Sequence, residues 1–244
     1  GYLANGGNWK PSVGFHGNPG TTEVTDTGIP PVLISEILTH TDSPLVDAIE
    51  LHNPSSQFID ISGWRLTESA SSLQGFRIPD GTVIPPGGYL VFDETDFNPN
   101  GLWNPNAGPR GSNEFALSGA RGGDIWFIEA DSAGNLLGFV DHVEFGASLN
   151  GVSLGRWPNG SGGKLYPMKE RSLFDETIST YPPAKRGGPN FGPMRGQVMI
   201  SEIMYNPPDG NQDLEYVELY NSSDSLVSLS GWELDKGVDF TFSP

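Results

Sequence analysis

The chain has no cysteine among its 244 residues, so it can form no disulfide bond and has no thiol chemistry. It also lacks any apolar run near the roughly 18 residues that a membrane-spanning helix needs. Basic residues are scarce, because 13 Lys and Arg stand against 30 Asp and Glu and give a formal net charge of −17. Such a charge opposes binding to nucleic acid or to an anionic membrane surface. We therefore expect no nucleic-acid partner and no membrane span.

No long stretch shows helical periodicity either. Short apolar runs alternate with clusters of turn-forming residues, and the chain holds 33 Gly and 21 Pro. This pattern predicts an all-β protein, and nine short strands in about 126 residues suit two packed sheets. The expected strands cover residues 32–38, 48–53, 64–68, 75–78, 89–93, 114–117, 124–130, 137–145 and 152–157.

One pattern occurs twice in the chain. Ile-Ser-Glu-Ile at residues 34–37 returns at residues 200–203, and Ser-Gly-Trp at residues 62–64 returns at residues 230–232. A repeat at this long spacing indicates tandem domains rather than a solenoid of short units. We expect a linker or tail of a preceding module at residues 1–31, a complete module at 32–157, a Gly/Pro-rich basic connector at 158–197, and the truncated N-terminal part of a second module at 198–244.

The connector differs in charge from its surroundings, with six basic and three acidic residues between two acidic modules. It could dock on one or both modules, or it could be a solvated linker. The linker interpretation is favoured, because exposed ion pairs contribute little to stability.

Strand alternation predicts which side chains are buried. Trp64 follows a Ser-Gly turn and is expected in the core, and of the adjacent Trp126 and Phe127 only one can point inward. Glu36 and Glu202 stand inside otherwise apolar strands, so we expect them to accept buried hydrogen bonds in a structural role.

One motif suggests catalysis. Gly-Val-Ser-Leu-Gly at residues 151–155 fits a hydrolase nucleophile elbow, but the residues that follow cannot start the helix which that motif needs. The four His are scattered, so no zinc signature is present. No catalytic residue is therefore predicted.

Residues 96–101, Asp-Phe-Asn-Pro-Asn-Gly, fit the first half of a calcium loop, although the twelfth position is Ala107 instead of Glu. A metal-free surface loop is the alternative. Calcium is the one cofactor that the sequence suggests, with these expected ligands: Asp93, Asp96, Asn98 and Asn100. Two further acidic loops at equivalent places are a calcium or partner site or simply solvated turns: Asp42 and Asp47 in the first copy, and Asp209, Asp213 and Glu215 in the second.

Taken together, several motifs resemble the lamin tail domain in its bacterial form. They are Ile-Ser-Glu-Ile at residues 34–37, Glu-Leu-His-Asn at 50–53, Ser-Gly-Trp at 62–64, Ile-Pro-Pro-Gly-Gly-Tyr-Leu-Val at 84–91, Phe-Ala-Leu-Ser at 115–118 and Gly-Val-Ser-Leu-Gly-Arg at 151–156. The resemblance implies an immunoglobulin-like β-sandwich, often in tandem in large secreted or surface-attached bacterial proteins. It supplies no common catalytic residues, and a fold by itself does not define a function.

We therefore expect a non-enzymatic extracellular module that serves as scaffold, spacer or adhesion surface. Its partners would be neighbouring modules of the same polypeptide or assembly, a protein or a polysaccharide. The first rival is a carbohydrate- or protein-binding accessory module of an enzyme, which a row of exposed aromatics would favour: Trp9, Trp103, Trp157 and Tyr166. The second rival, a hydrolase, would need a concave site with convergent titratable groups.

Overall fold

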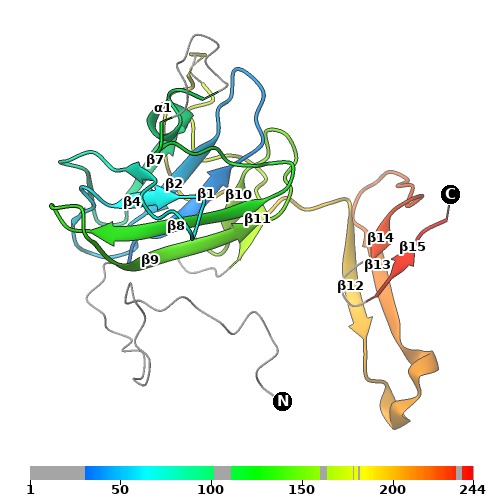
Figure 1. The fold of residues 1–244 in the computed structure, drawn as a ribbon. Helices are drawn as coiled ribbons and strands as arrows, with labels where there is room; N and C mark the ends of the chain where they lie inside the picture. The colour runs from blue at the N-terminus through cyan, green and yellow to red at the C-terminus, as the bar shows by residue number, and fades with distance from the viewer. Residues whose placement is uncertain are drawn as a thin grey trace. The chain divides into compact units, whose positions relative to one another are not determined.

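The computed structural model describes residues 31–101, 111–159, 164–177, 179–180, 182–234 and 238–243. The chain divides into two compact units, the first ending at Met194 and the second beginning at Arg195. In both, the regular structure is predominantly short antiparallel strands, which confirms the all-β prediction (Figure 1). In these ranges no helix is long and apolar enough to cross a membrane. The expected linker at residues 1–31 lies outside the described residues, except for Pro31.

The first unit is a sandwich of two main sheets. Its elements are β1 (Leu33–Leu38), β2 (Ala48–His52), β3 (Ile59–Asp60), β4 (Arg65–Thr67), β5 (Phe76–Arg77), β6 (Val83–Ile84), β7 (Tyr89–Asp93), α1 (Glu94–Phe97), β8 (Gly123–Ala130), β9 (Leu136–Phe145), β10 (Leu154–Arg156) and β11 (Leu165–Pro167). One sheet has the order β11-β10-β1-β2-β7, the other β5-β4-β8-β9, and β3 pairs with β6. In Figure 1, β8 and β9 run side by side below β7 and β2.

The core lies between the two sheets, where alternate residues of β1 and β2 meet those of β4, β8 and β9. Trp64 is only 4% exposed and lies 5.2 Å from Phe127 between ring centroids, which confirms its predicted place. Phe127 is fully buried, whereas Trp126 stacks on His142 outside this core, so one of the two adjacent rings points inward as expected.

The predicted strand at residues 114–117 is wrong. This segment has no strand, yet Phe115 and Leu117 are both buried, and the Phe115 N–H donates to the Phe97 carbonyl at 3.2 Å. Its alternation of apolar and polar residues therefore reflects burial against α1 rather than pairing in a sheet. The two-residue strands β3 and β6 and the four-residue α1 were not expected, because so few residues carry no periodicity.

The expected boundary at Trp157 also requires correction, because the first compact unit continues to Met194. β11 pairs with β10, and Leu173 and Phe174 are buried against Leu38 and Ala48. We call residues 164–194 the strap. Its Gly and Pro content suggested a solvated connector, but the alternative, docking on the first module, is what the structure shows.

The second unit contains β12 (Val198–Met204), β13 (Tyr216–Asn221), β14 (Glu233–Leu234) and β15 (Phe240–Thr241), with 3-10 turns at Pro208–Gly210 and Gln212–Leu214. β12 pairs with β13, and β14 with β15. The β12–β13 register repeats that of β1–β2, including a bulge between Ile200 and Glu202 that matches the one between Ile34 and Glu36.

The Ser-Gly-Trp turns also match. Gly63 and Gly231 have φ of 78° and 74°, a conformation that a side chain disfavours.

Candidate functional site

Two carboxyls on adjacent strands are among the fully buried polar groups of the first unit. Glu36 of β1 is the direct partner of Glu50 of β2, and both side chains are fully buried. Ser172 of the strap lies over them: its N–H donates to Glu36 Oε2 at 3.1 Å, and its hydroxyl contacts both carboxyls. The predicted structural role of Glu36 is thus confirmed, and its partner is the strap.

Burial makes the charged form of each carboxyl costly. It raises the pKa of Glu50 to about 8, helped by repulsion from Glu36, and it raises the pKa of Glu36 against the opposing hydrogen bonds from Ser153 and Ser172. Two buried carboxyls this close favour holding at least one proton at neutral pH. The pair is therefore arranged to accept hydrogen bonds from the strap while carrying little net charge.

Two further residues of the strap bind the same sheet. The Gly188 N–H donates to Glu50 Oε2 at 2.9 Å, and the Asn190 amide donates to the carbonyls of Ser35 and Arg156 at 3.2 and 2.9 Å. Gly155 allows this approach, because a Cβ there would lie 2.9 Å from the Asn190 side chain. These contacts make the strap part of the folded unit.

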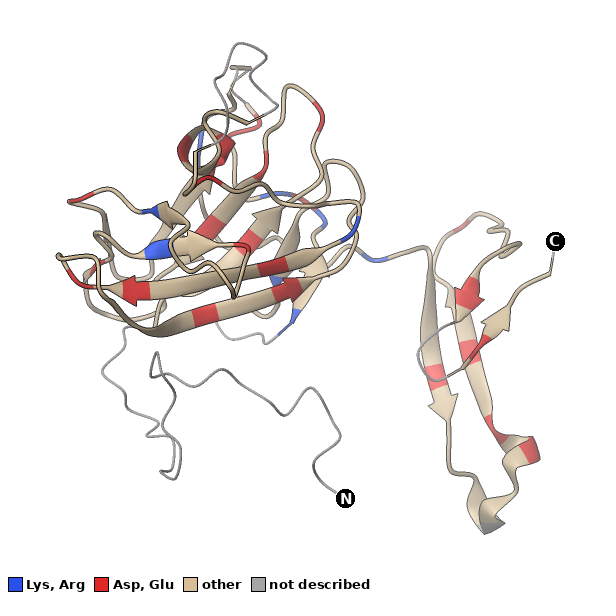
Figure 2. Ribbon diagram, viewed as in Figure 1, with Lys and Arg blue, Asp and Glu red and all other residues tan. Residues whose placement is uncertain are grey.

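A buried ion pair joins the two sheets. The Arg156 guanidinium of β10 donates to both carboxylate oxygens of Asp141 in β9, at 2.9 and 2.8 Å, and to the Ile34 carbonyl at 2.8 Å. Burial raises the pKa of Asp141, and the charge of Arg156 opposes that rise. Figure 2 shows how few basic positions lie among the acidic ones. Because the paired groups are mostly buried, removing one of them would leave an unpaired charge.

The predicted calcium ligands are engaged in other contacts. The Asp93 side chain caps α1, and the ammonium of Lys185 contacts both Asp93 and Asp96. The Asn98 amide donates to Glu94 at 2.9 Å, and the Asn100 amide donates to Glu114 at 2.7 Å. The structure therefore brings Asp93 and Asp96 together around a lysine and directs the two asparagines elsewhere. Ala107 lies outside the described residues.

No group of three or more His, Cys, Asp or Glu in the described ranges is arranged to hold a metal ion. Calcium binding at this loop stays a prediction, in which the cation would compete with Lys185.

The acidic loops that follow the first strand of each unit differ in burial. Asp47 is buried, which raises its pKa to about 7, and it accepts a bond from the Thr41 hydroxyl at 2.8 Å. Asp42 accepts from the Asn150 amide at 2.5 Å. In the second unit Asp213 and Glu215 are exposed, and the side chain of Asp209 lies outside the described residues.

The Gly151–Gly155 motif has the wrong context for a nucleophile. Ser153 is fully buried just before β10, and that strand continues into the ladder with β1 rather than turning into a helix. A nucleophile elbow would lift the serine out at a strand-to-helix turn.

The four candidate aromatics separate into two groups. Trp157 and Tyr166 are 39% and 40% exposed, whereas Trp9 and Trp103 lie outside the described residues. Tyr166 lies opposite Gly155, and Trp157 is two residues further along, so both side chains point to the same face.

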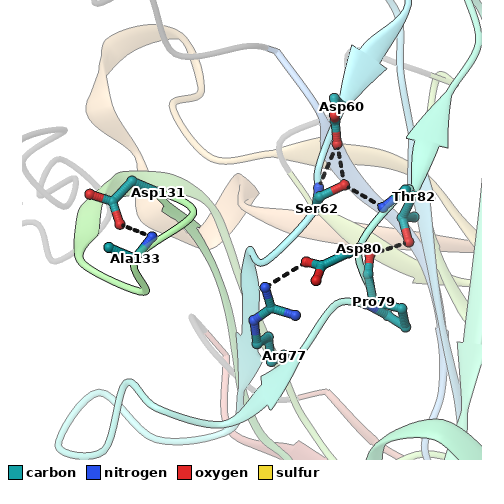
Figure 3. Close-up of polar contacts among 9 residues, drawn as sticks. Asp60, Ser62, Arg77, Pro79, Asp80, Thr82, Asp131 and Ala133 are labelled. Carbon is teal, nitrogen blue, oxygen red and sulfur yellow. Dashed lines mark hydrogen bonds and ion pairs between the residues drawn. The ribbon is translucent and has the colours of Figure 1, made fainter.

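A cluster of exposed polar contacts near β3 and β6 closes turns (Figure 3). The Ser62 N–H donates to Asp60 at 2.9 Å, and Arg77 pairs with Asp80 at 2.5 Å. The figure also shows the Ala133 N–H donating to Asp131, at 2.9 Å. Each bond joins residues two or three apart, as in Asx turns, so these carboxylates stabilise loops.

The sequence analysis left docking of this segment open but did not identify the residues that the strap binds. Two signals pointed to this docking: Ser172-Leu173-Phe174 puts two large apolar residues inside a Gly/Pro-rich stretch, and Glu36 and Glu50 occupy strands too apolar to leave them without partners. Neither signal identifies the other as its contact, because the two lie more than a hundred residues apart.

Two antiparallel sheets packed over one core define an immunoglobulin-like β-sandwich module. The family model of the lamin tail domain matches residues 25–146 and 193–244. The chain therefore belongs to the lamin tail domain family, whose domain is immunoglobulin-like and non-catalytic. No protein of curated function matches the chain significantly.

Proposed function

We propose that this chain is a non-catalytic structural module of a large secreted or cell-surface bacterial protein, where it serves as spacer, scaffold or adhesion surface. The observation that supports this proposal is that three buried carboxyls are engaged in contacts inside the fold. Glu36 and Glu50 bind the strap and fasten it to their sheet, and Asp141 binds Arg156 and thereby joins the two sheets. A spacer that bears load needs such cross-connections, whereas a catalytic carboxyl needs access to substrate.

Location tests this proposal directly. An antibody raised against the chain should label intact cells of the source organism or detect the protein in the medium, and protease added outside should remove the signal. A signal that appears only after lysis would contradict the proposal. The non-catalytic part is tested separately: turnover of ester, glycoside or phosphodiester substrates that persists through repurification would contradict it.

A second candidate, a carbohydrate-binding accessory module, is favoured by Trp157 and Tyr166. Two exposed rings on one face of a sheet edge can stack against sugar rings. Affinity electrophoresis in polysaccharide gels should then show retardation that Trp157→Ala and Tyr166→Ala abolish. Phe191→Ala, at an aromatic of similar exposure, is the matched control and should leave retardation unchanged. Equal mobility with and without polysaccharide would exclude this candidate.

A further inference from the structure

A groove of about 440 Å³ lies on the first unit, between two limbs of the strap and the segment that leads into β10. One limb contributes residues 168–171 and 176, the other contributes residues 186, 191 and 194, and residues 151–153 complete the lining. A volume of this size is within the range of ligand-binding clefts, roughly 300–1,000 Å³. The lining includes neither the predicted calcium ligands nor the exposed pair Trp157 and Tyr166.

Backbone hydrogen bonds fix the two limbs to each other. The Lys169 N–H donates to the Gly192 carbonyl at 2.9 Å, and the Met194 N–H donates to the Pro167 carbonyl at 2.7 Å. The groove is therefore largely formed before any ligand arrives, and binding has to order only side chains.

Arg186 offers hydrogen-bond donors that the fold itself does not use. Its guanidinium lies over the ring of Phe191, with 6.0 Å between the central carbon and the ring centroid. Both side chains are exposed, and within the described part of the chain the guanidinium makes no hydrogen bond or ion pair. Its planar N–H donors match the two oxygens of a carboxylate.

The other two basic residues of the groove are paired to different degrees. Arg171 donates to Glu176 at 2.9 Å and to the Gly151 carbonyl, and its side chain is 23% exposed, so it forms part of the wall. Lys169 is 70% exposed and lies 3.6 Å from Glu170. An exposed pair of this kind contributes little to stability, so the Lys169 ammonium is available to a ligand.

Apolar side chains supply the rest of the binding surface. Met168 is almost fully buried, whereas Phe191 and Met194 are 44% and 43% exposed. Methionine side chains adapt to apolar groups of varied shape. The groove thus places a carboxylate-binding group beside an apolar surface.

Charge complementarity indicates the class of ligand. Residues 32–157 hold five basic and sixteen acidic residues, whereas residues 164–194 hold five basic and three acidic ones. The strap is therefore the positive region of an otherwise acidic unit, and it attracts a ligand that carries a carboxylate.

Two observations favour a peptide over an acidic polysaccharide. A chain with evenly repeated negative charges would meet Glu170 and Glu176, which line the same groove. The Phe191 ring, moreover, already has the Arg186 guanidinium over it, which leaves less of the ring for stacking on a sugar. A peptide avoids both conflicts, because it can place a single carboxylate next to an apolar side chain.

We propose that this groove binds an extended segment of a partner protein in which an acidic residue stands beside an apolar one. The acidic side chain accepts hydrogen bonds from Arg186 and is attracted by Lys169, while the apolar side chain packs on Phe191 and Met194. Electrostatic attraction brings the segment to the groove, and the apolar contact adds affinity. This assignment goes beyond the proposed function and does not depend on where the protein is located.

The test begins with an array of short synthetic peptides that carry acidic and apolar residues in every order, probed with the full chain. The best binders are then labelled and titrated by fluorescence anisotropy, and saturable binding at about 100 μM or tighter is expected. Replacing their acidic residues by Asn and Gln should weaken binding by about tenfold, because the charge-assisted hydrogen bonds are lost. Replacing their apolar residues by Ser should also weaken it.

Variants of the chain test the groove itself. Arg186→Gln should weaken binding by about tenfold. The matched control, Arg121→Gln, removes the same charge from an exposed position of the first unit outside the groove and should change the affinity by about twofold at most. Because both side chains are exposed, the two variants should melt at the same temperature as the unchanged chain.

Three results would overturn the proposal. The first is no binding by any peptide of the array at about 1 mM. The second is equal weakening by Arg186→Gln and Arg121→Gln, which would show a bulk charge effect. The third is tighter binding of a uronic-acid oligosaccharide than of any peptide, because an acidic polysaccharide would then be the ligand.

Discussion

The β1–β2 pair of the first unit and the β12–β13 pair of the second have the same pattern, register and bulge, yet opposite burial. Ile34 and Ile37 are fully buried, whereas Ile200 and Ile203 are 51% and 57% exposed. The pairing of two neighbouring strands is thus specified by their own sequence. The burial of their side chains is not specified in this way, because it requires the opposite sheet and the strap. Among the described residues, only the first unit has both.

The largest expected effect comes from removing the strap. A shortened chain of residues 31–157 should lose cooperative unfolding, because it exposes Glu36, Glu50 and the surface that Leu173 and Phe174 cover. A chain of residues 31–194 should keep a single sharp transition in urea. Equal stability of the two chains would show that the strap does not contribute to the stability of the sandwich, and it would restore the domain boundary at Trp157.

The two equivalent tryptophans sharpen the comparison. Trp64→Ala should lower the free energy of unfolding of the first unit by about 3–5 kcal/mol, because the ring is almost fully buried. Trp232 is 46% exposed, and Trp232→Ala should change stability by about 0.5 kcal/mol or less. Urea melts of both variants measure this difference. Similar losses would mean that Trp232 is buried in solution, as it would be if a partner covered the second unit.

The carboxyl pairs differ in their expected pH dependence. The folded-state pKa of Glu50 is raised to about 8, so its stabilising contribution is complete below its unfolded value near 4.5 and is lost as the pH rises through about 8. Glu36 shifts the same way, and so does Asp47, to about 7. The melting temperature of the first unit should therefore fall between about pH 5 and pH 8.

Glu50→Gln, which mimics the protonated acid, should flatten this fall and raise the melting temperature at pH 9. Glu218→Gln, at the exposed counterpart, should leave the curve unchanged. If the first unit becomes more stable from pH 5 to pH 8, burial does not raise the pKa values of these carboxyls.

The smallest effect is expected at the α1 loop, which lies in the first unit. Calcium at about ten millimolar, above the weak range of extracellular sites, should raise the melting temperature slightly, because Lys185 already neutralises Asp93 and Asp96. Lys185→Met should enlarge the shift and Asp96→Ala should abolish it. If calcium shifts none of the three proteins, or shifts all of them equally, the loop holds no calcium site.

Local periodicity was enough to predict most of the strands. Tyr89–Asp93 forms β7 over the predicted range, and the expected strands at residues 124–130 and 137–145 differ from β8 and β9 by one residue each. The inward position of Trp64 followed in the same way. Where alternation came from burial without pairing, as at Phe115 and Leu117, the same argument gave a strand that does not exist.

By itself, then, the sequence determined the all-β class and the repeated strand pair, because these depend on alternation and turn residues close together in the chain, and its motifs carried the resemblance to the lamin tail domain. Only the tertiary structure decided what Glu36 and Glu50 bind and what fills the place predicted for calcium. Ser172 is 136 residues from Glu36, and Lys185 is 89 from Asp96. Contacts at such separations follow from how the sheets pack and where the strap crosses them, and no local pattern encodes that path.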